Sequence, residues 1–173
     1  MKKFPKLFYR LSIWLVFFIS TDLLSTYLVT PDLKYEFNVW VRWFHLGWPG
    51  TILLASLQGA LFVLGFFLSV RFIKGKLPKW GTIWGAKLGI GLFIFHFAGS
   101  VLATINNLIG YFYLKGHQTD IKSFVAWYVV NVNSSKYYLT WFGITKLVVA
   151  IWFTPLVFRR LANDKLVSSS IHE

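Results

Sequence analysis

Four long apolar stretches alternate with short polar segments along the chain. Each is free, or nearly free, of Asp, Glu, Lys and Arg over about 20 residues, the length that a helix needs to cross the hydrocarbon core of a bilayer. The pattern predicts an all-α integral membrane protein, a four-helix bundle that forms one domain over residues 1–173. The predicted spans are residues 11–29, 51–73, 83–113 and 139–157. The third is longer than a span requires, which leaves open a strong tilt or a helix that projects beyond the bilayer.

The first apolar stretch follows Lys2 and Lys3, as the apolar part of a cleaved secretory signal would. The stretch is too long for such a signal, it contains Asp22, and no pair of small residues with cleavage spacing follows it. We therefore expect this segment to remain as a membrane span.

The distribution of basic residues predicts the orientation, because short loops rich in Lys and Arg stay on the cytoplasmic side. Twelve lie before the first span, around the turn between the second and third spans, and after the fourth, whereas five lie in the two alternate segments. Both termini are therefore predicted to be cytoplasmic. The twelve are Lys2, Lys3, Lys6, Arg10, Arg71, Lys74, Lys76, Lys79, Lys87, Arg159, Arg160 and Lys165, and the five are Lys34, Arg42, Lys115, Lys122 and Lys136.

Composition supports the same class of protein. The chain is 56% hydrophobic and only 14% charged, which is outside the usual balance of soluble domains. Its net charge of +12 could suggest a nucleic-acid partner, but no nucleic-acid-binding module is present, so we expect anionic lipids on the cytoplasmic side instead. The absence of Cys excludes disulfides, thiol catalysis and Cys-ligated metals, and we expect no cofactor.

The two predicted outer loops have a mixture of apolar and polar residues. Residues 35–46 favour a short interfacial helix, and residues 124–132 are apolar enough to dip into the interface. The first loop also carries Glu36 and Asn38. Three Trp residues in or beside it are expected at the headgroup level: Trp40, Trp43 and Trp48.

Polar residues inside the spans are the candidate functional groups, because burial in a bilayer is costly and such residues usually face a partner or a cavity. Counting about seven residues inward from each outer end predicts one polar level about 10 Å below the outer interface. Asp22 and Thr26 would share a helix face there, four residues apart. The residues assigned to this level are Asp22, Gln58, Asn106, Asn107 and Lys146.

The third span carries a stripe of small and polar residues that should face the bundle interior. Its members are His96, Gly99, Ser100, Ala103, Asn107 and Gly110. We interpret His96 as a hydrogen-bonded histidine of the bundle rather than a metal ligand. Gly85 and Gly89 add a weaker small-xxx-small signal for close helix packing.

Two alternatives remain open for the charged residues. Lys146 either snorkels to the outer headgroups or forms a charge pair with Asp22, directly or through Asn107. Asp22 has too short a side chain to snorkel, so it must pair, take up a proton or meet water in a cavity.

The chain resembles an uncharacterised family of small polytopic prokaryotic membrane proteins, on the motifs Asp22-x3-Thr26, Glu36-x-Asn38 and the late Asn107. The resemblance covers roughly the first 115 residues. Val39 stands where that family has Pro, and Gln58 or Ser56 stands near the place of its intramembrane Lys. The resemblance would transfer the role of that Lys to Lys146. It implies a multi-pass protein of a prokaryotic cell membrane, and no particular activity.

Two function classes remain. The favoured one is a non-enzymatic accessory subunit, or a small binder or carrier of a polar headgroup, ion or small solute, assisted by a membrane-protein partner or by homo-oligomerisation. The alternative is an intramembrane hydrolase or transferase that uses Asp22 and Glu36 as an acid and base pair. A metal variant would recruit Glu36, His45 and His117, although no two of these have ligand spacing.

Overall fold

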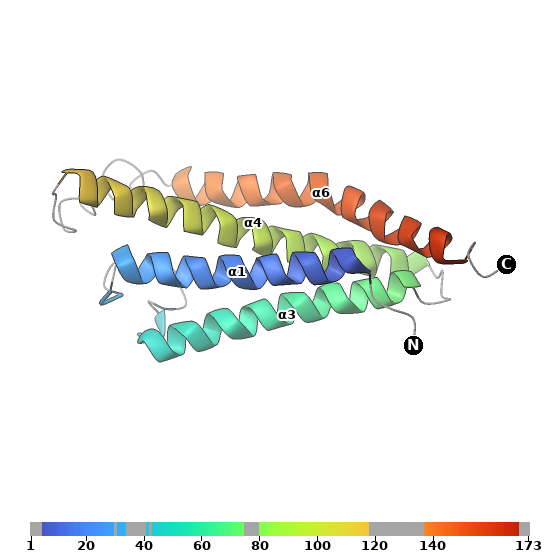
Figure 1. Ribbon diagram of the computed structural model, residues 1–173, viewed down its shortest axis with the longest axis horizontal. Helices are drawn as coiled ribbons and strands as arrows, with labels where there is room; N and C mark the ends of the chain where they lie inside the picture. Colours follow the sequence, from blue (N-terminus) through green and yellow to red (C-terminus); the bar gives the residue numbers. More distant parts are fainter. Residues whose placement is uncertain are drawn as a thin grey trace.

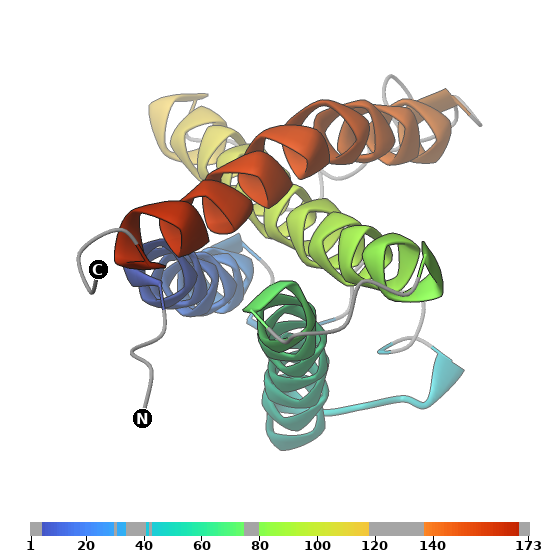
Figure 2. The same ribbon diagram turned by 90° about the vertical axis from the view of Figure 1, so that its right-hand side faces the viewer.

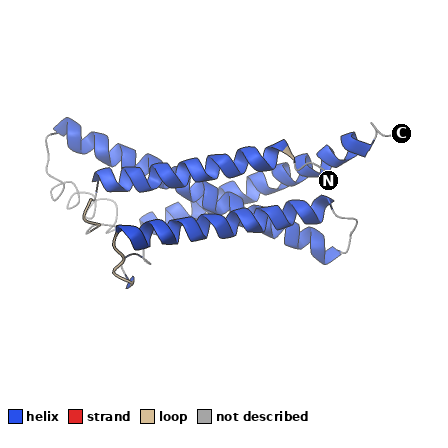
Figure 3. Cartoon of the chain, turned by 60° about the horizontal axis from the view of Figure 1, so that its bottom comes forward, coloured by secondary structure: helices blue, strands red, loops and turns tan. Residues whose placement is uncertain are grey.

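The described part of the chain is helical and contains no strand (Figures 1 and 3). The computed structural model describes residues 5–29, 31–33, 41, 43–74, 80–117 and 137–169. Its helices are α1 (Lys6–Val29), α3 (Trp48–Lys74), α4 (Trp80–His117) and α6 (Tyr137–Ser169). All four are long and apolar enough to cross a membrane, which confirms the four predicted segments as helices.

The helices extend further than the predicted spans. The 38 residues of α4 form one continuous helix, which includes the apolar section Ile83–Leu108. Whether this helix tilts in a bilayer or projects beyond it stays open. α6 continues through Arg159 and Arg160 to Ser169 instead of ending at residue 157. Basic residues interrupt an apolar run, but they are good helix formers and do not end the helix.

The bundle is organised around α4, which packs against each of the other three helices. α1 and α3 also pack against each other, whereas α6 lies mainly on α4 and touches α3 less. Figure 2 shows α4 and α6 crossing, with α1 and α3 on the other side of α4. A direct pair of Asp22 and Lys146 would require α1 and α6 to be neighbours, but α4 separates these helices over most of their length.

The hydrophobic core lies in the half of the bundle where α1 begins and α6 ends. The rings of Phe66 on α3 and Phe93 on α4 are fully buried and stack with centroids 4.4 Å apart. Phe8 of α1 packs on Phe66 at 5.2 Å, and Leu161 of α6 completes the same cluster. Apolar side chains of all four helices meet here. The polar side-chain contacts between α1 and α4 lie toward the opposite end of the bundle.

α3 and α4 approach most closely at Gly89. A Cβ atom added at Gly89 would clash with Ser69 Oγ and lie 3.0 Å from the carbonyl oxygen of Gly65. A Cβ at Gly85 would meet nothing within 4 Å. Of the two glycines in the predicted small-xxx-small pair, only Gly89 is needed for this packing.

α6 bends partway along its length, and its C-terminal part turns toward the side of α4 on which α1 lies (Figures 1 and 2). Pro155 lies inside the helix and has no N–H to donate to the preceding turn, which is the usual cause of a kink. Thr154 Oγ1 donates to the carbonyl oxygen of Ala150 at 2.5 Å, so the hydroxyl supports the backbone beside the bend. The bend places Leu161 in the core.

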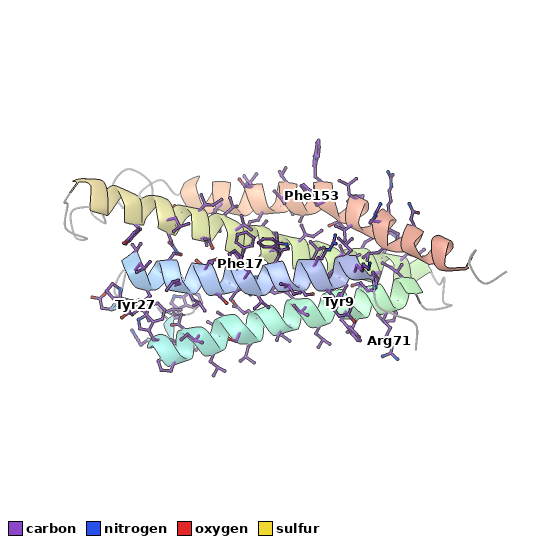
Figure 4. All side chains as sticks on the ribbon, in the orientation of Figure 1. Tyr9, Phe17, Tyr27, Arg71 and Phe153 are labelled. Atoms are coloured by element: carbon purple, nitrogen blue, oxygen red, sulfur yellow. The ribbon has the colours of Figure 1, made fainter. Side chains whose placement is uncertain are left out.

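Basic side chains gather at the end of the bundle where α1 and α4 begin and α3 and α6 end. Arg71, on the outer side of α3, lies near this end, whereas Tyr27 lies near the other (Figure 4). Exposed basic residues at this end are Lys6, Arg10, Arg71, Arg159 and Arg160. The predicted interfacial segments lie outside the described residues, entirely for residues 124–132 and largely for residues 35–46, of which only 41 and 43–46 are described.

Candidate functional site

One amide joins the polar residues of α1 and α4. Asn107 Nδ2 donates to Asp22 Oδ1 at 3.1 Å and to Thr26 Oγ1 at 2.9 Å. Asp22 and Thr26 lie one helical turn apart on the α1 face that packs against α4, so one side chain from α4 reaches both. We call these three residues the Asp22 cluster.

The backbone of α1 is held firmly beneath the cluster. Ser25 is 2% exposed, and its hydroxyl donates to the carbonyl oxygen of Asp22 at 3.0 Å. Asp22, Thr26 and Asn107 are each half-buried, so the cluster lies at the edge of the packed interface and not inside the core.

A second pair of hydroxyls links the same two helices one turn deeper. Thr21 and Thr104 have their Oγ1 atoms 3.4 Å apart, and Thr104 Oγ1 also lies within hydrogen-bonding distance of the carbonyl oxygens of Phe18 (3.3 Å) and Ser100 (2.9 Å). Sequence reasoning missed both residues. The signal that could have found Thr104 is its spacing, three residues before Asn107 and four after Ser100 on the same stripe.

The predicted common polar level is wrong, because the polar residues lie at two levels. Lys146 packs at Gly99, where an added Cβ would lie 3.1 Å from Lys146 Cδ. Gly99 is eight residues before Asn107, or about 12 Å along α4. α3 runs antiparallel to α4, with Phe62 against His96, and this register places Gln58 near the level of Ser100. The Asp22 cluster and the adjacent Asn106 thus lie at one level, while Gln58, His96 and Lys146 lie nearer the middle of the bundle.

The Lys146 ammonium lies between aromatic rings. Its Nζ is 4.6 Å from the ring centroid of Phe95 and 4.8 Å from that of Phe142. Among the residues that the structure describes, no carboxylate forms an ion pair with it. The side chain lies beside Gly99 of α4 and reaches toward Phe142, one turn earlier on α6, and this geometry shows no direct pair with Asp22. Snorkelling stays a prediction.

His96 stacks on an aromatic ring instead of taking part in a polar contact with α3. Its ring lies 4.3 Å from that of Phe62 at an interplanar angle of 20°. Nε2 is buried and has no hydrogen-bond partner among the described residues, which corrects the expectation of a hydrogen-bonded histidine at this atom. Within the same described residues, no group of three potential metal ligands occurs.

The remaining predicted site residues are only partly placed. Glu36 and Asn38 lie outside the described residues, so neither the carboxylate pair nor the metal variant that uses Glu36 is tested. Asn106 and Gln58 are half-buried.

The Asp22 cluster is rich in hydrogen-bond acceptors. Because Asn107 uses its amide hydrogens on α1, its carbonyl oxygen remains an acceptor beside the Asp22 carboxylate and the Thr26 hydroxyl. Such a set suits a cation or a group with several donors. It contains no nucleophile activated by a neighbouring base among the described residues.

Comparison of the chain with protein-family models, with curated proteins and with solved structures finds no match. The resemblance to small prokaryotic membrane proteins therefore stays a prediction.

Proposed function

We propose that the chain is a multi-pass protein of the cell membrane with both termini on the cytoplasmic side. The helices present large apolar side chains to their surroundings, among them Trp152 at 74% exposed, Ile13 at 68% and Leu61 at 66%. Such a surface suits lipid and not water. The basic residues gathered at the end where α1 begins support a cytoplasmic position for that end.

Reporter fusions test this orientation. Fusions after Lys76 and after Arg160 should report a cytoplasmic location, and fusions at Lys34 and Lys122 an external one, because the twelve-to-five distribution of basic residues sets the topology. A cytoplasmic signal from either of the last two positions would contradict the four-span arrangement.

We propose further that the protein is a non-enzymatic binder of a cationic, hydrogen-bond-donating group at the Asp22 cluster. The observation that carries this is the bridge from Asn107 to both Asp22 and Thr26, which fixes a carboxylate and two neutral oxygens at the outer edge of the α1–α4 interface. A primary ammonium, from a lipid headgroup or a small solute, has the charge and the three donors to match.

Ligand-induced stabilisation of the purified protein tests this binding role. Ethanolamine should raise the unfolding temperature, whereas choline, which has no N–H donor, should raise it less at equal concentration and ionic strength. Asp22→Asn should abolish the difference between the two amines. The matched control is Asp32→Asn, a carboxylate in the turn after α1 and outside the cluster, which should leave the difference unchanged. Equal effects of both amines on the unchanged protein would contradict the proposal.

A second candidate, the accessory subunit, is favoured by Lys146. A cation inside an apolar helix is costly, and rings compensate for only part of the lost hydration. A carboxylate at this depth, on a transmembrane helix of a partner or of a second copy, would compensate for the rest of the lost hydration energy. The hydrolase alternative needs Glu36 next to Asp22, and that arrangement stays a prediction.

A further inference from the structure

A half-buried lysine other than Lys146, and separate from the Asp22 cluster, lies at the crossing of α4 and α6. Lys87 is half-buried on α4, and its Nζ lies 5.2 Å from the ring centroid of Trp84 and 5.4 Å from that of Phe158 on α6. Two aromatic rings from two helices thus hold this ammonium in place. A cation held in advance loses less entropy on binding an anion than a freely moving surface lysine does.

Further positive charge adjoins this position. Arg159 and Arg160 follow Phe158 directly and are exposed. No carboxylate among the side chains that the structure describes pairs with Lys87 or Arg159. Asp22 and Asp32 belong to the other half of the bundle, whereas Asp164 lies on α6, one helical turn after Arg160.

The apolar surroundings determine which kind of anion fits. Trp84 is 56% exposed beside Lys87, and Leu88, 64% exposed, follows one turn later on α4. A soluble anion gains nothing from such a surface, whereas the acyl chains of a lipid would cover it. Basic sites between membrane helices at the cytoplasmic side are suited to anionic headgroups.

We propose that the α4–α6 crossing at Lys87 is a binding site for the phosphate group of an anionic lipid. Lys87 and Arg159 bind the phosphate, Trp84 lies beside the headgroup, and the acyl chains follow the exposed apolar side of α4. Pro155 lies one turn before Phe158, so the bend of α6 is next to the ring that contacts Lys87. This site is independent of ligand binding at the Asp22 cluster.

Native mass spectrometry of the full chain, released from micelles that contain phosphatidylglycerol or phosphatidylcholine, tests the site. The unchanged protein should retain phosphatidylglycerol in preference to phosphatidylcholine. Lys87→Gln and Arg159→Gln should each weaken phosphatidylglycerol retention by about fivefold, the effect of one basic residue near an anionic surface. Lys87→Arg, which keeps the charge, should retain most of the binding.

Arg71→Gln is the matched control, because it removes an equal charge at the same end of the bundle but from the outer side of α3 (Figure 4). It should change retention by less than about twofold if binding is local and not a response to net charge. If Arg71→Gln and Lys87→Gln lost equal amounts of phosphatidylglycerol retention, the proposal of a local site at Lys87 would be wrong. Displacement of the lipid by millimolar inorganic phosphate would overturn the lipid assignment in favour of a soluble phosphate. If Lys87→Gln fails to fold, the exposed Arg159→Gln decides the question.

Discussion

Replacing Gly89 with alanine should destabilise the bundle by about 1–3 kcal/mol, the usual cost of forcing extra volume into a packed interface. The added Cβ would clash with Ser69 Oγ and lie 3.0 Å from the backbone oxygen of Gly65. Rotation of Ser69 could relieve the first contact at the cost of its 2.8 Å hydrogen bond to Gly65 O. Only separation of α3 and α4 relieves the second, and that separation loosens the stacked Phe66 and Phe93 rings. Unfolding in mild detergent, followed by circular dichroism, measures the loss.

Two matched controls use glycines of the same helix pair. A Cβ at Gly65 or at Gly85 would meet nothing within 4 Å, so Gly65→Ala and Gly85→Ala should be neutral, or stabilising by up to about 1 kcal/mol through helix propensity. Adding Ser69→Ala to Gly89→Ala should recover only part of the loss, since the Gly65 carbonyl remains. If the three single alanine variants were equally stable, α3 and α4 would not pack closely at Gly89.

The helices could be predicted from sequence because the length of each apolar run along the chain is their main determinant. A run of about 20 apolar residues must satisfy its backbone hydrogen bonds within itself when it crosses a bilayer, so it is helical whatever its neighbours are. The ends could not be predicted in this way. Arg159 and Arg160 end the apolar run of α6, but the helix continues past them to Ser169.

The levels of the polar residues depend on packing, which the sequence does not express directly. Counting inward from the outer ends assumes that all four helices begin at one plane. α6 crosses α4 at an angle and meets Gly99 with Lys146, which places that residue about 12 Å from the predicted partner level. The α1 residues of the site were easier to predict, because the helical spacing of Asp22 and Thr26 alone puts them on one face. Asn107 was predicted to lie on the inward stripe of α4, and it contacts both of them.

The stripe on α4 also shows what periodicity can and cannot resolve. It correctly predicted that Ser100 and Gly99 face other helices, and both do. Periodicity could not predict that His96 would stack on a phenylalanine ring, because its partner depends on how α3 is aligned along α4. Thr104 was missed because a threonine in an apolar helix can also bond to its own preceding turn, as its hydroxyl does with Ser100.

Asn107→Ala should destabilise the protein by about 1–3 kcal/mol, because it removes two hydrogen bonds, one of them to a carboxylate at the edge of the interface. Asp22→Asn should cost less, since an amide at position 22 still offers an oxygen to Asn107. If the two residues act through their shared bond, the double variant should be less destabilised than the sum of the single losses, with a coupling of at least about 0.5 kcal/mol. Thermal or denaturant unfolding of all four proteins in one detergent measures this.

The pair Asp22 and Lys146 is the control for that coupling. Lys146→Met removes the ammonium but keeps an apolar chain of similar length between Phe95 and Phe142. Because Lys146 lies at the level of Gly99 and Asp22 at the level of Asn107, we expect the effects of Asp22→Asn and Lys146→Met to add within about 0.5 kcal/mol. Lys146→Met alone should leave stability unchanged or raise it, since no described carboxylate is left behind when the ammonium is removed. Coupling between Asp22 and Lys146 as large as that between Asp22 and Asn107 would restore the charge pair and contradict the two separate levels.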